Sequence, residues 1–264
     1  MRAAMVAICL LLPTCGVADD WEPPDNPDPQ AIMAEAKTDT RAGRYEDALA
    51  KHVWYHENAL QLRPSLTGVR LSFALMNWLQ LGEAYPPALE KMKQVRDETE
   101  KRIRDEDNVR IRFEDFHDFV ALNRTLREEH RTAELFQWVD ERDEEDAQRV
   151  FDVARPALIK QGEFELCGKY IESEQEMSRI DRNYILGLKM AEDRFGEQHR
   201  QYVEKKFLND VTTLAALLVK NGRIDEATDV AAKAQKLVQD PQLLEKLSKQ
   251  LEPAMLGTVP KPWP

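Results

Sequence analysis

Residues 211–241 read VTTLAALLVKNGRIDEATDVAAKAQKLVQDP, and this stretch decides the fold class. Leucine and alanine recur every three or four residues before Gly222, which is the spacing of one apolar face of a helix. The spacing resumes after the glycine, where small alanines dominate the face. Glycine adopts the left-handed conformation that a sharp turn needs, and small side chains let two helices approach closely. The stretch therefore predicts two packed helices joined at Gly222.

This helical hairpin resembles a tetratricopeptide repeat. The residues that carry the resemblance are Leu214, Ala215 and Leu218 in the first helix, Gly222 and Ile224 at the turn, Ala227, Ala231 and Ala234 in the second helix, and Pro241 at the end. The pattern returns around Gly162 and, more loosely, around Gly43. The resemblance implies an all-α fold, an irregular tetratricopeptide-like α-solenoid of helical hairpins over residues 31–251. Such arrays stack hairpins in series and leave a concave surface for binding.

The composition also favours helices, because only 10 glycines occur in 264 residues and charged residues make up 32%. Residues 71–81 are apolar on nearly every side, so we expect this helix at the centre of an N-terminal core. Residues 184–207 have apolar side chains at helical spacing and predict one long amphipathic helix. Asn209 and Asp210 are typical cap residues, so the next helix is expected to start near Val211.

Residues 1–18 are typical of a signal peptide, with a short apolar run that follows a positive residue and ends in small residues. We expect cleavage after Ala18 and a periplasmic or secreted mature chain. A lipid anchor at Cys15 is the alternative, but Pro13 and Thr14 stand where a lipoprotein signal usually has small residues. No later segment is apolar enough to predict a transmembrane helix.

Two proline-rich segments flank the predicted repeats. Residues 19–30 are rich in proline and aspartate and predict an extended leader, and residues 252–264 predict a similar tail. Each contains a tryptophan, Trp21 in the leader and Trp263 in the tail. Either tryptophan is a docking anchor or simply an exposed aromatic residue, and the sequence leaves both interpretations open.

Charge and cysteine content exclude some function classes. The net charge of −11 offers no basic surface for phosphates, so we expect no nucleic-acid partner. Removal of residues 1–18 leaves Cys167 as the single cysteine, and an exported chain with one thiol has no internal disulfide bond. Cys167 lies on an apolar helical face, which favours a small buried side chain over a nucleophile.

Residues 43–64, GRYEDALAKHVWYHENALQLRP, are similar to a stretch found in exported bacterial repeat proteins, a likeness that implies no activity. In an ordinary repeat the second-helix alanines stand seven residues apart, whereas Ala48 and Ala59 stand eleven apart. The four extra residues amount to about one helical turn, so the apolar stripe continues in phase. His52 and His56 fall on that stripe.

The inserted turn supports two different sites. His52 and His56 have the i, i+4 spacing that lets two imidazoles bind one metal ion, although no third ligand can be named. Alternatively, they are partly buried polar residues with ordinary hydrogen bonds. His52, Trp54, Tyr55 and His56, with Trp78 nearby in sequence, also suit the edge of a peptide-binding groove, because aromatic side chains are favoured interface anchors.

We find no glycine-rich phosphate loop, no nucleophile elbow and no CxxC motif, and we expect no cofactor. The favoured function is an exported, non-catalytic helical-repeat protein that binds a protein or peptide partner in a concave groove. One alternative is a metal-dependent enzyme, or an accessory domain of an enzyme, that uses His52 and His56. Another alternative is a structural scaffold of the cell envelope.

Overall fold

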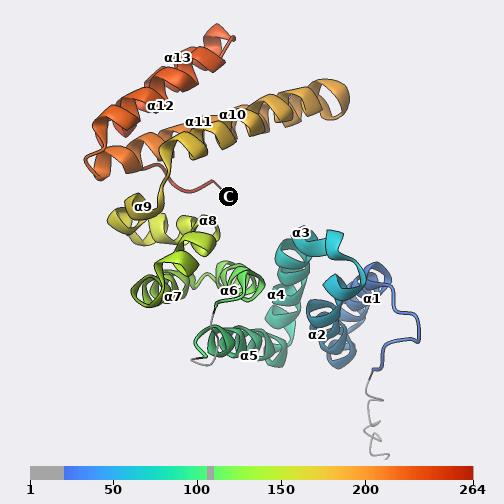
Figure 1. The fold of residues 1–264 in the computed structure, drawn as a ribbon. Helices are drawn as coiled ribbons and strands as arrows, with labels where there is room; N and C mark the ends of the chain where they lie inside the picture. Colours follow the sequence, from blue (N-terminus) through green and yellow to red (C-terminus); the bar gives the residue numbers. More distant parts are fainter. Residues whose placement is uncertain (1–20, 106–109, 264) are drawn as a thin grey trace, which may run out of the picture. The chain divides into compact units, whose positions relative to one another are not determined.

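The structure, a computed structural model, describes residues 21–105 and 110–263. Helices account for all the regular secondary structure of these residues, which confirms the predicted all-α class (Figure 1). The predicted signal sequence, residues 1–18 with Cys15, lies outside the described residues. The chain divides into two compact units, Met1–Met92 and Lys93–Pro264, and the boundary falls within helix α5.

The first unit is built on a pair of helices and a longer helical segment that contains a short π-helical turn. Its elements are α1 (Pro29–Ala42), α2 (Tyr45–Leu62), η1 (Pro64–Leu66), α3 (Thr67–Val69), η2 (Arg70–Ala74), α4 (Leu75–Ala84) and the start of α5 (Pro86–Ile103). Proline opens α1, η1 and α5, where its missing N–H removes no helical hydrogen bond.

The second unit has its own hydrophobic core and a long pair of helices, α10 and α11, that lie side by side (Figure 1). Its elements after α5 are α6 (Phe113–Leu126), α7 (Glu129–Arg142), α8 (Glu144–Gln161), α9 (Phe164–Tyr170), α10 (Ser173–Met190), η3 (Ala191–Phe195), α11 (Gly196–Lys220), α12 (Ile224–Leu237) and α13 (Pro241–Ala254). Helix α11 also contacts α9, α12 and α13 and is therefore the central element of this unit.

Four turns between consecutive helices share one geometry. The residues with positive φ at these turns are Gly43, Arg127, Gly162 and Gly222. In each turn the next residue donates its N–H to the carbonyl five positions earlier, over 2.8–2.9 Å. These two features define a Schellman cap, which satisfies carbonyl groups at the end of the first helix. The helix pairs are α1–α2, α6–α7, α8–α9 and α11–α12.

The second helix of each pair has a small residue in its first turn, where the two helices pack. Five positions after the left-handed residue stand Ala48, Thr132, Cys167 and Ala227, all at most 1% exposed. A small side chain there allows close packing of the two helices. Burial raises the pKa of the Cys167 thiol to about 12, which matches the prediction that this residue packs rather than reacts.

The prediction of one helix over residues 184–207 is wrong. The chain reverses at Gly196, which has φ of +71°, and α10 and α11 form an antiparallel hairpin around this point. Tyr184 on α10 therefore stacks on Phe207 of α11, with 4.2 Å between their ring centroids. Apolar residues line both helices at matching spacing, so the periodicity runs through the reversal without a break. Asn209 and Asp210 lie inside α11 and do not cap it.

The helix over residues 71–81 is covered on one face only. Leu75, Trp78 and Leu81 are at most 1% exposed, as expected for the core of the first unit. Phe73 and Met76 are 71% and 55% exposed, which contradicts the expectation that a helix with apolar residues on nearly every side is covered on several faces. The π-helical turn at Arg70–Ala74 precedes α4, and the buried face after it has ordinary helical spacing.

Candidate functional site

The five residues singled out from the sequence lie in the first unit, and four of them are in its interior. His52, Tyr55, His56 and Trp78 are 1–6% exposed. The Trp78 indole stacks on the His52 ring at 6.2 Å and meets the His56 ring edge-on at 6.0 Å. Trp78 also donates its indole N–H to the Ala88 carbonyl over 2.9 Å. The contacts of Trp78 with the two histidines and with Ala88 tie α2 to α4 and to the start of α5.

His52 has an unusual environment for a polar side chain. Neither of its ring nitrogens has a hydrogen-bond partner among the described residues. Burial, with a smaller contribution from the charge of Lys37, lowers the pKa of His52 to about 4. The imidazole is therefore neutral near pH 7. His56 differs, because the Arg70 guanidinium donates to its carbonyl over 2.6 Å and lies 3.4 Å from its Nε2.

The metal hypothesis for His52 and His56 stays a prediction. Within residues 21–105 and 110–263, no group of three or more His, Cys, Asp or Glu side chains forms a metal-binding arrangement. The structure instead places both imidazoles against Trp78. A zinc site needs four ligands in a tetrahedral arrangement, of which the protein usually supplies at least three.

Trp54, the fifth predicted residue, is half-buried and contacts the leader. The Trp21 ring meets the Trp54 ring edge-on at 6.3 Å, and the Lys51 ammonium lies 5.5 Å from the Trp21 ring centroid. Lys51 is itself buried and forms an ion pair with Asp39. Burial alone would raise the pKa of Asp39, but Lys51 and Arg44 outweigh it and hold this pKa below its usual range. Trp21 is thus a docking anchor that fixes the leader on α2.

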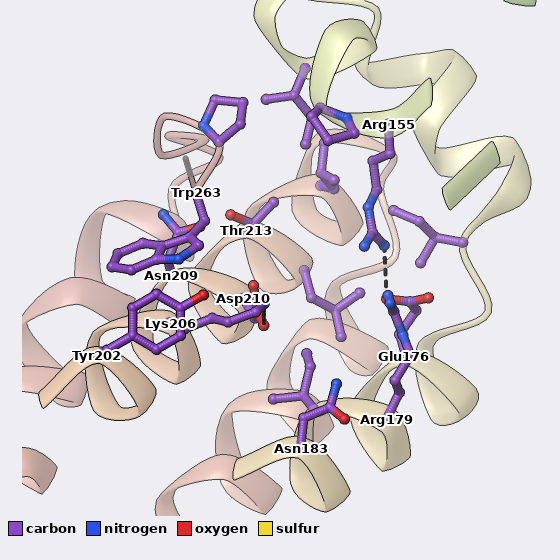
Figure 2. Close-up of a pocket in the computed structure, with 17 residues that line it drawn as sticks. Arg155, Glu176, Arg179, Asn183, Tyr202, Lys206, Asn209, Asp210, Thr213 and Trp263 are labelled. Carbon is purple, nitrogen blue, oxygen red and sulfur yellow. Dashed lines mark hydrogen bonds and ion pairs between the residues drawn. The ribbon is translucent and has the colours of Figure 1, made fainter. Parts of the chain in front are cut away.

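A hollow of about 300 Å³ in the second unit is lined by side chains from several elements (Figure 2). We call it the α11 groove. One face of α11 forms its floor, α8 and α10 form one wall, and the C-terminal tail closes another side. The lining residues used below are Arg155, Glu176, Arg179, Asn183, Tyr202, Lys206, Asn209, Asp210, Thr213 and Trp263.

The charged side chains of the α11 groove form ion pairs with one another. Glu176 accepts hydrogen bonds from Arg155 over 2.7 Å and from Arg179 over 2.5 Å, and Lys206 pairs with Asp210 over 2.5 Å. Burial alone would raise the pKa of Glu176, but the two arginines outweigh it and lower this pKa. The two carboxylates offset two of the three positive charges, so the groove has strongly polar walls with a net charge of +1 from these five residues.

The C-terminal tail lies against this groove. It leaves α13 through Gly257, which has φ of +80° and lies near Val219 and Lys220 at the end of α11. Further along, the Asn209 side-chain amide donates a hydrogen bond to the Lys261 carbonyl over 3.0 Å. The Trp263 ring then meets the Tyr202 ring edge-on at 5.7 Å. An extended stretch of polypeptide thus follows α11 toward its first turns (Figure 2).

A row of aromatic rings continues along α11 beyond the tail. Phe195, His199 and Tyr202 contact one another in sequence, with ring centroids 5.1 Å and 6.2 Å apart. Phe195 and Tyr202 are each 48% exposed. A second hollow of about 240 Å³ shares Ile180, Asn183, Tyr202, Lys206 and Asp210 with the α11 groove and therefore adjoins it. Its lining continues to the exposed side chains of Leu186 and Met190.

Two polar atoms in the α11 groove have no hydrogen-bond partner among the described residues. They are the Thr213 hydroxyl oxygen and the indole nitrogen of Trp263. Both atoms are shielded from solvent, and an unsatisfied buried polar group costs about 1–3 kcal/mol. The fit between the tail and the groove is therefore incomplete.

Sequence reasoning identified little of this groove. Asn209 is a typical cap residue by sequence, but it lies inside α11 and its side chain binds the tail. Trp263 had two open interpretations, of which the structure supports docking. The remaining residues come from three helices and the tail, and no local pattern links them. The one available signal is the spacing of Phe195, His199 and Tyr202 in the sequence, although Phe195 precedes the reversal at Gly196 and lies outside α11.

Comparisons with known proteins add no family assignment. No protein-family model, curated protein or solved structure gives a significant match to this chain. None of the helices in the described part of the chain combines the length and hydrophobicity that a membrane span requires. The function is therefore inferred from the site alone.

Proposed function

We propose that this chain is an exported, non-catalytic binding protein, and that the α11 groove holds an extended segment of a partner protein or peptide. One observation carries the proposal: an extended segment already lies there, with the Lys261 carbonyl bound by the Asn209 amide. A side-chain amide that binds a main-chain carbonyl recognises an extended backbone whatever its side chains are. The groove thus has the chemistry needed to bind polypeptide.

The aromatic row supports the same function. Phe195 and Tyr202 are half-exposed, although large aromatic side chains are more often covered in a folded chain. Aromatic residues are enriched among the side chains that contribute most to binding at protein interfaces. Four rings, including the tail tryptophan, follow one another along α11. This row is a suitable set of anchors for a partner segment.

We propose further that the helical hairpins form an irregular tetratricopeptide-type α-solenoid. Support comes from the four Schellman turns and from the small buried residue that follows each of them. In such arrays a concave surface binds extended segments or helices. The sequence around Gly222 carries the resemblance to this repeat family.

Export is proposed from residues 1–18, which lie outside the described residues. The test is N-terminal sequencing of the chain recovered from the periplasmic or secreted fraction. We expect the sequence to start at Asp19. A mature chain that starts at Cys15 would instead indicate a lipid anchor, and an intact residue 1 in every fraction would contradict export.

Site-specific photo-crosslinking tests the binding function. A photoreactive phenylalanine analogue replaces Tyr202 in the full chain, and a second chain carries it at Ile224, which is 50% exposed at the start of α12. We expect a discrete crosslinked product from position 202 and none from position 224. Asn209→Ala should abolish that product, whereas Gln201→Ala, which removes an exposed amide from the same helix, should leave it unchanged.

The identity of the product decides between functions. Peptide mapping that finds an extended segment of another protein supports the proposal. A product that contains only a second copy of this chain supports the scaffold alternative. Equal labelling at positions 202 and 224, or labelling that survives Asn209→Ala, would show that the α11 groove is not the binding surface.

A further inference from the structure

We propose that residues 258–263 are a displaceable internal ligand of the α11 groove, and that the external ligand is an extended, proline-containing segment with an aromatic side chain. This inference rests on the proposed binding function and specifies its ligand. The tail segment reads TVPKPW, with proline at positions 260 and 262 on either side of Lys261. Alternating prolines favour the extended polyproline II conformation, which leaves main-chain carbonyls available for hydrogen bonds.

Three features of the tail make contacts with the second unit. The Asn209 amide binds a carbonyl between two prolines, which is a group that a polyproline II segment always presents. The Tyr202 ring contacts the Trp263 ring two residues later. Val259 packs on the hydrophobic core of the second unit. A ligand with the same chemistry therefore has an apolar residue, a proline pair and an aromatic residue in this order.

The tail is held weakly enough to be displaced. One hydrogen bond, from Asn209 to Lys261, joins residues 259–263 to α11 in the described part of the chain. The Trp263 indole nitrogen is shielded from solvent without an acceptor, and the Thr213 hydroxyl is also unpartnered among the described residues. Such groups oppose docking by about 1–3 kcal/mol each. An external segment that supplies partners for the groove would bind better than the tail.

The second hollow explains how an external segment gains further contacts. It adjoins the α11 groove at Tyr202 and Lys206 and extends past the tail toward Leu186 and Met190. These two side chains are 57% and 40% exposed. A segment that continues beyond its aromatic residue with an apolar side chain would cover this surface. The internal ligand then prevents weaker segments from binding and yields to longer ones.

Competition in the full-length chain tests the inference. The probe is a fluorescein-labelled heptapeptide TVPKPWP with an amidated C-terminus, and its dissociation constant is measured by fluorescence anisotropy. Trp263→Ala should weaken the internal ligand. If the tail occupies the groove about nine-tenths of the time, the variant binds the probe about 10-fold more tightly than the wild-type chain. Leu256→Ala, at an 85% exposed position before the tail segment, is the control and should match wild type.

Second substitutions locate the binding. Asn209→Ala or Tyr202→Ala in the Trp263→Ala chain should weaken probe binding about 10-fold or more, in line with interface anchors. Gln201→Ala in the same chain should have no effect. A probe extended by one leucine after the final proline should bind the Trp263→Ala chain more tightly than the heptapeptide.

Other outcomes overturn the inference. Equal binding of the probe to wild-type and Trp263→Ala chains, with sensitivity to Asn209→Ala, would show that the tail does not compete. Absence of probe binding to every variant would show that the groove does not take this ligand chemistry. In both cases a crosslink from position 202 to another protein would still support the proposed binding function, so the two failures are distinguishable. Hydrogen exchange in α11 confirms that each variant is folded.

Discussion

His52 is a polar side chain whose environment suits only one protonation state. It is 2% exposed, stacks on Trp78, and has no hydrogen-bond partner for either ring nitrogen among the described residues. Most buried polar groups in proteins have a partner, so its position lowers the stability of the first unit. Adding a proton would place an unpaired charge in the core. The neutral imidazole is therefore the only form that the native fold accommodates well.

The first unit should lose stability in mild acid because of His52. Its pKa is lowered to about 4 in the fold, whereas the unfolded chain takes up the proton near pH 6.5. The contribution of the neutral His52 to the free energy of unfolding is fully present above pH 6.5 and is lost as pH falls toward 4. One pKa unit corresponds to about 1.4 kcal/mol, so the total loss is about 3 kcal/mol. Hydrogen exchange in α2 and α4, followed from pH 7 to pH 4.5, measures it.

His52→Phe supplies the control for this pH dependence. Phenylalanine keeps a planar ring against Trp78 but cannot be protonated. Other groups that titrate in this range affect both chains equally, so the difference between the two pH profiles isolates His52. Parallel profiles for the wild-type and His52→Phe chains would rule out the proposed contribution of the imidazole.

Gly168 lies where α9 packs against the end of α11, and the absence of a side chain at this position allows the close contact. A Cβ atom at this position would lie 2.0–2.3 Å from the side-chain atoms of Asn221. That side chain donates to the Phe164 carbonyl of α9 over 2.9 Å and to the Leu217 carbonyl of α11 over 2.8 Å. It cannot move without losing these bonds, and the first of them connects α9 to the end of α11.

Gly168→Ala should therefore destabilise the second unit. Forcing an extra methyl group into a packed contact costs about 1–3 kcal/mol. Gly68→Ala is the matched control, because nothing lies within 4 Å of its Cβ and α3 has ordinary helical geometry. Urea unfolding monitored by circular dichroism should show a lower midpoint for Gly168→Ala and an unchanged or higher one for Gly68→Ala. Equal midpoints would mean that Asn221 can move at little cost.

At the level of helix pairs, the turn between α6 and α7 departs from the other three. It has Arg127 at φ of +61°, the one non-glycine residue with positive φ among those described. The left-handed conformation costs an L-residue about 1–2 kcal/mol. A glycine at this position avoids that cost, but it loses more backbone entropy on folding, which offsets about 0.5–1 kcal/mol of the gain. The Arg127 side chain is exposed, so its removal has little other effect.

Arg127→Gly should raise the stability of the second unit by about 0.5–1 kcal/mol, the difference between these two terms. The measurement is the free energy of unfolding from urea titration, together with hydrogen exchange in α6 and α7. Gly162→Ala makes the opposite change at φ of +84°, where nothing lies within 4 Å of a Cβ atom, and should lower stability by about 1 kcal/mol. A destabilised Arg127→Gly chain would show that the arginine makes a stabilising contact.

The helix pairs also show where sequence reasoning succeeds. Gly43, Gly162 and Gly222 were predicted as turns because a glycine interrupts helical periodicity there, and all three have positive φ. Arg127 has no such signal, since its turn depends on a Schellman cap formed by an ordinary residue. The sequence does not mark Gly196 as a turn, because apolar residues continue at helical spacing on both sides of it. A reversal between two helices with matching faces leaves almost no trace in periodicity.

Across the whole molecule, burial could be predicted better than the site. The sequence places His52 and Trp78 on apolar faces, and both side chains are buried. Because they are buried, neither can contact a partner in this conformation. The α11 groove joins residues from position 155 to position 263, so it arises only when α8, α10, α11 and the tail pack together. Periodicity gives the face of each helix but not the partners of that face. The hydrogen bond from the Asn209 amide to the Lys261 carbonyl is a contact of this kind, between residues far apart in the sequence.

The net charge of −11 belongs to the whole chain and should affect the rate of binding more than the contacts themselves. The groove side chains are paired with one another, but the acidic total attracts a cationic segment over long range. The heptapeptide TVPKPWP, with its N-terminus acetylated and its C-terminus amidated, carries one positive charge. Its association rate with the Trp263→Ala chain should fall about 3- to 10-fold between about 20 mM and 500 mM salt, as screening removes this attraction.

The dissociation rate should change much less, because it depends on contacts within the groove. Stopped-flow fluorescence measures both rates. The matched control is the same peptide with glutamine in place of lysine, which is neutral and should associate at nearly the same rate at both salt concentrations. If the neutral peptide showed the same salt dependence, the acidic total would have no part in steering. If instead the dissociation rate rose with salt, the lysine would contact a charged group in the groove, and Asp210, which already pairs with Lys206, would be the first residue to replace.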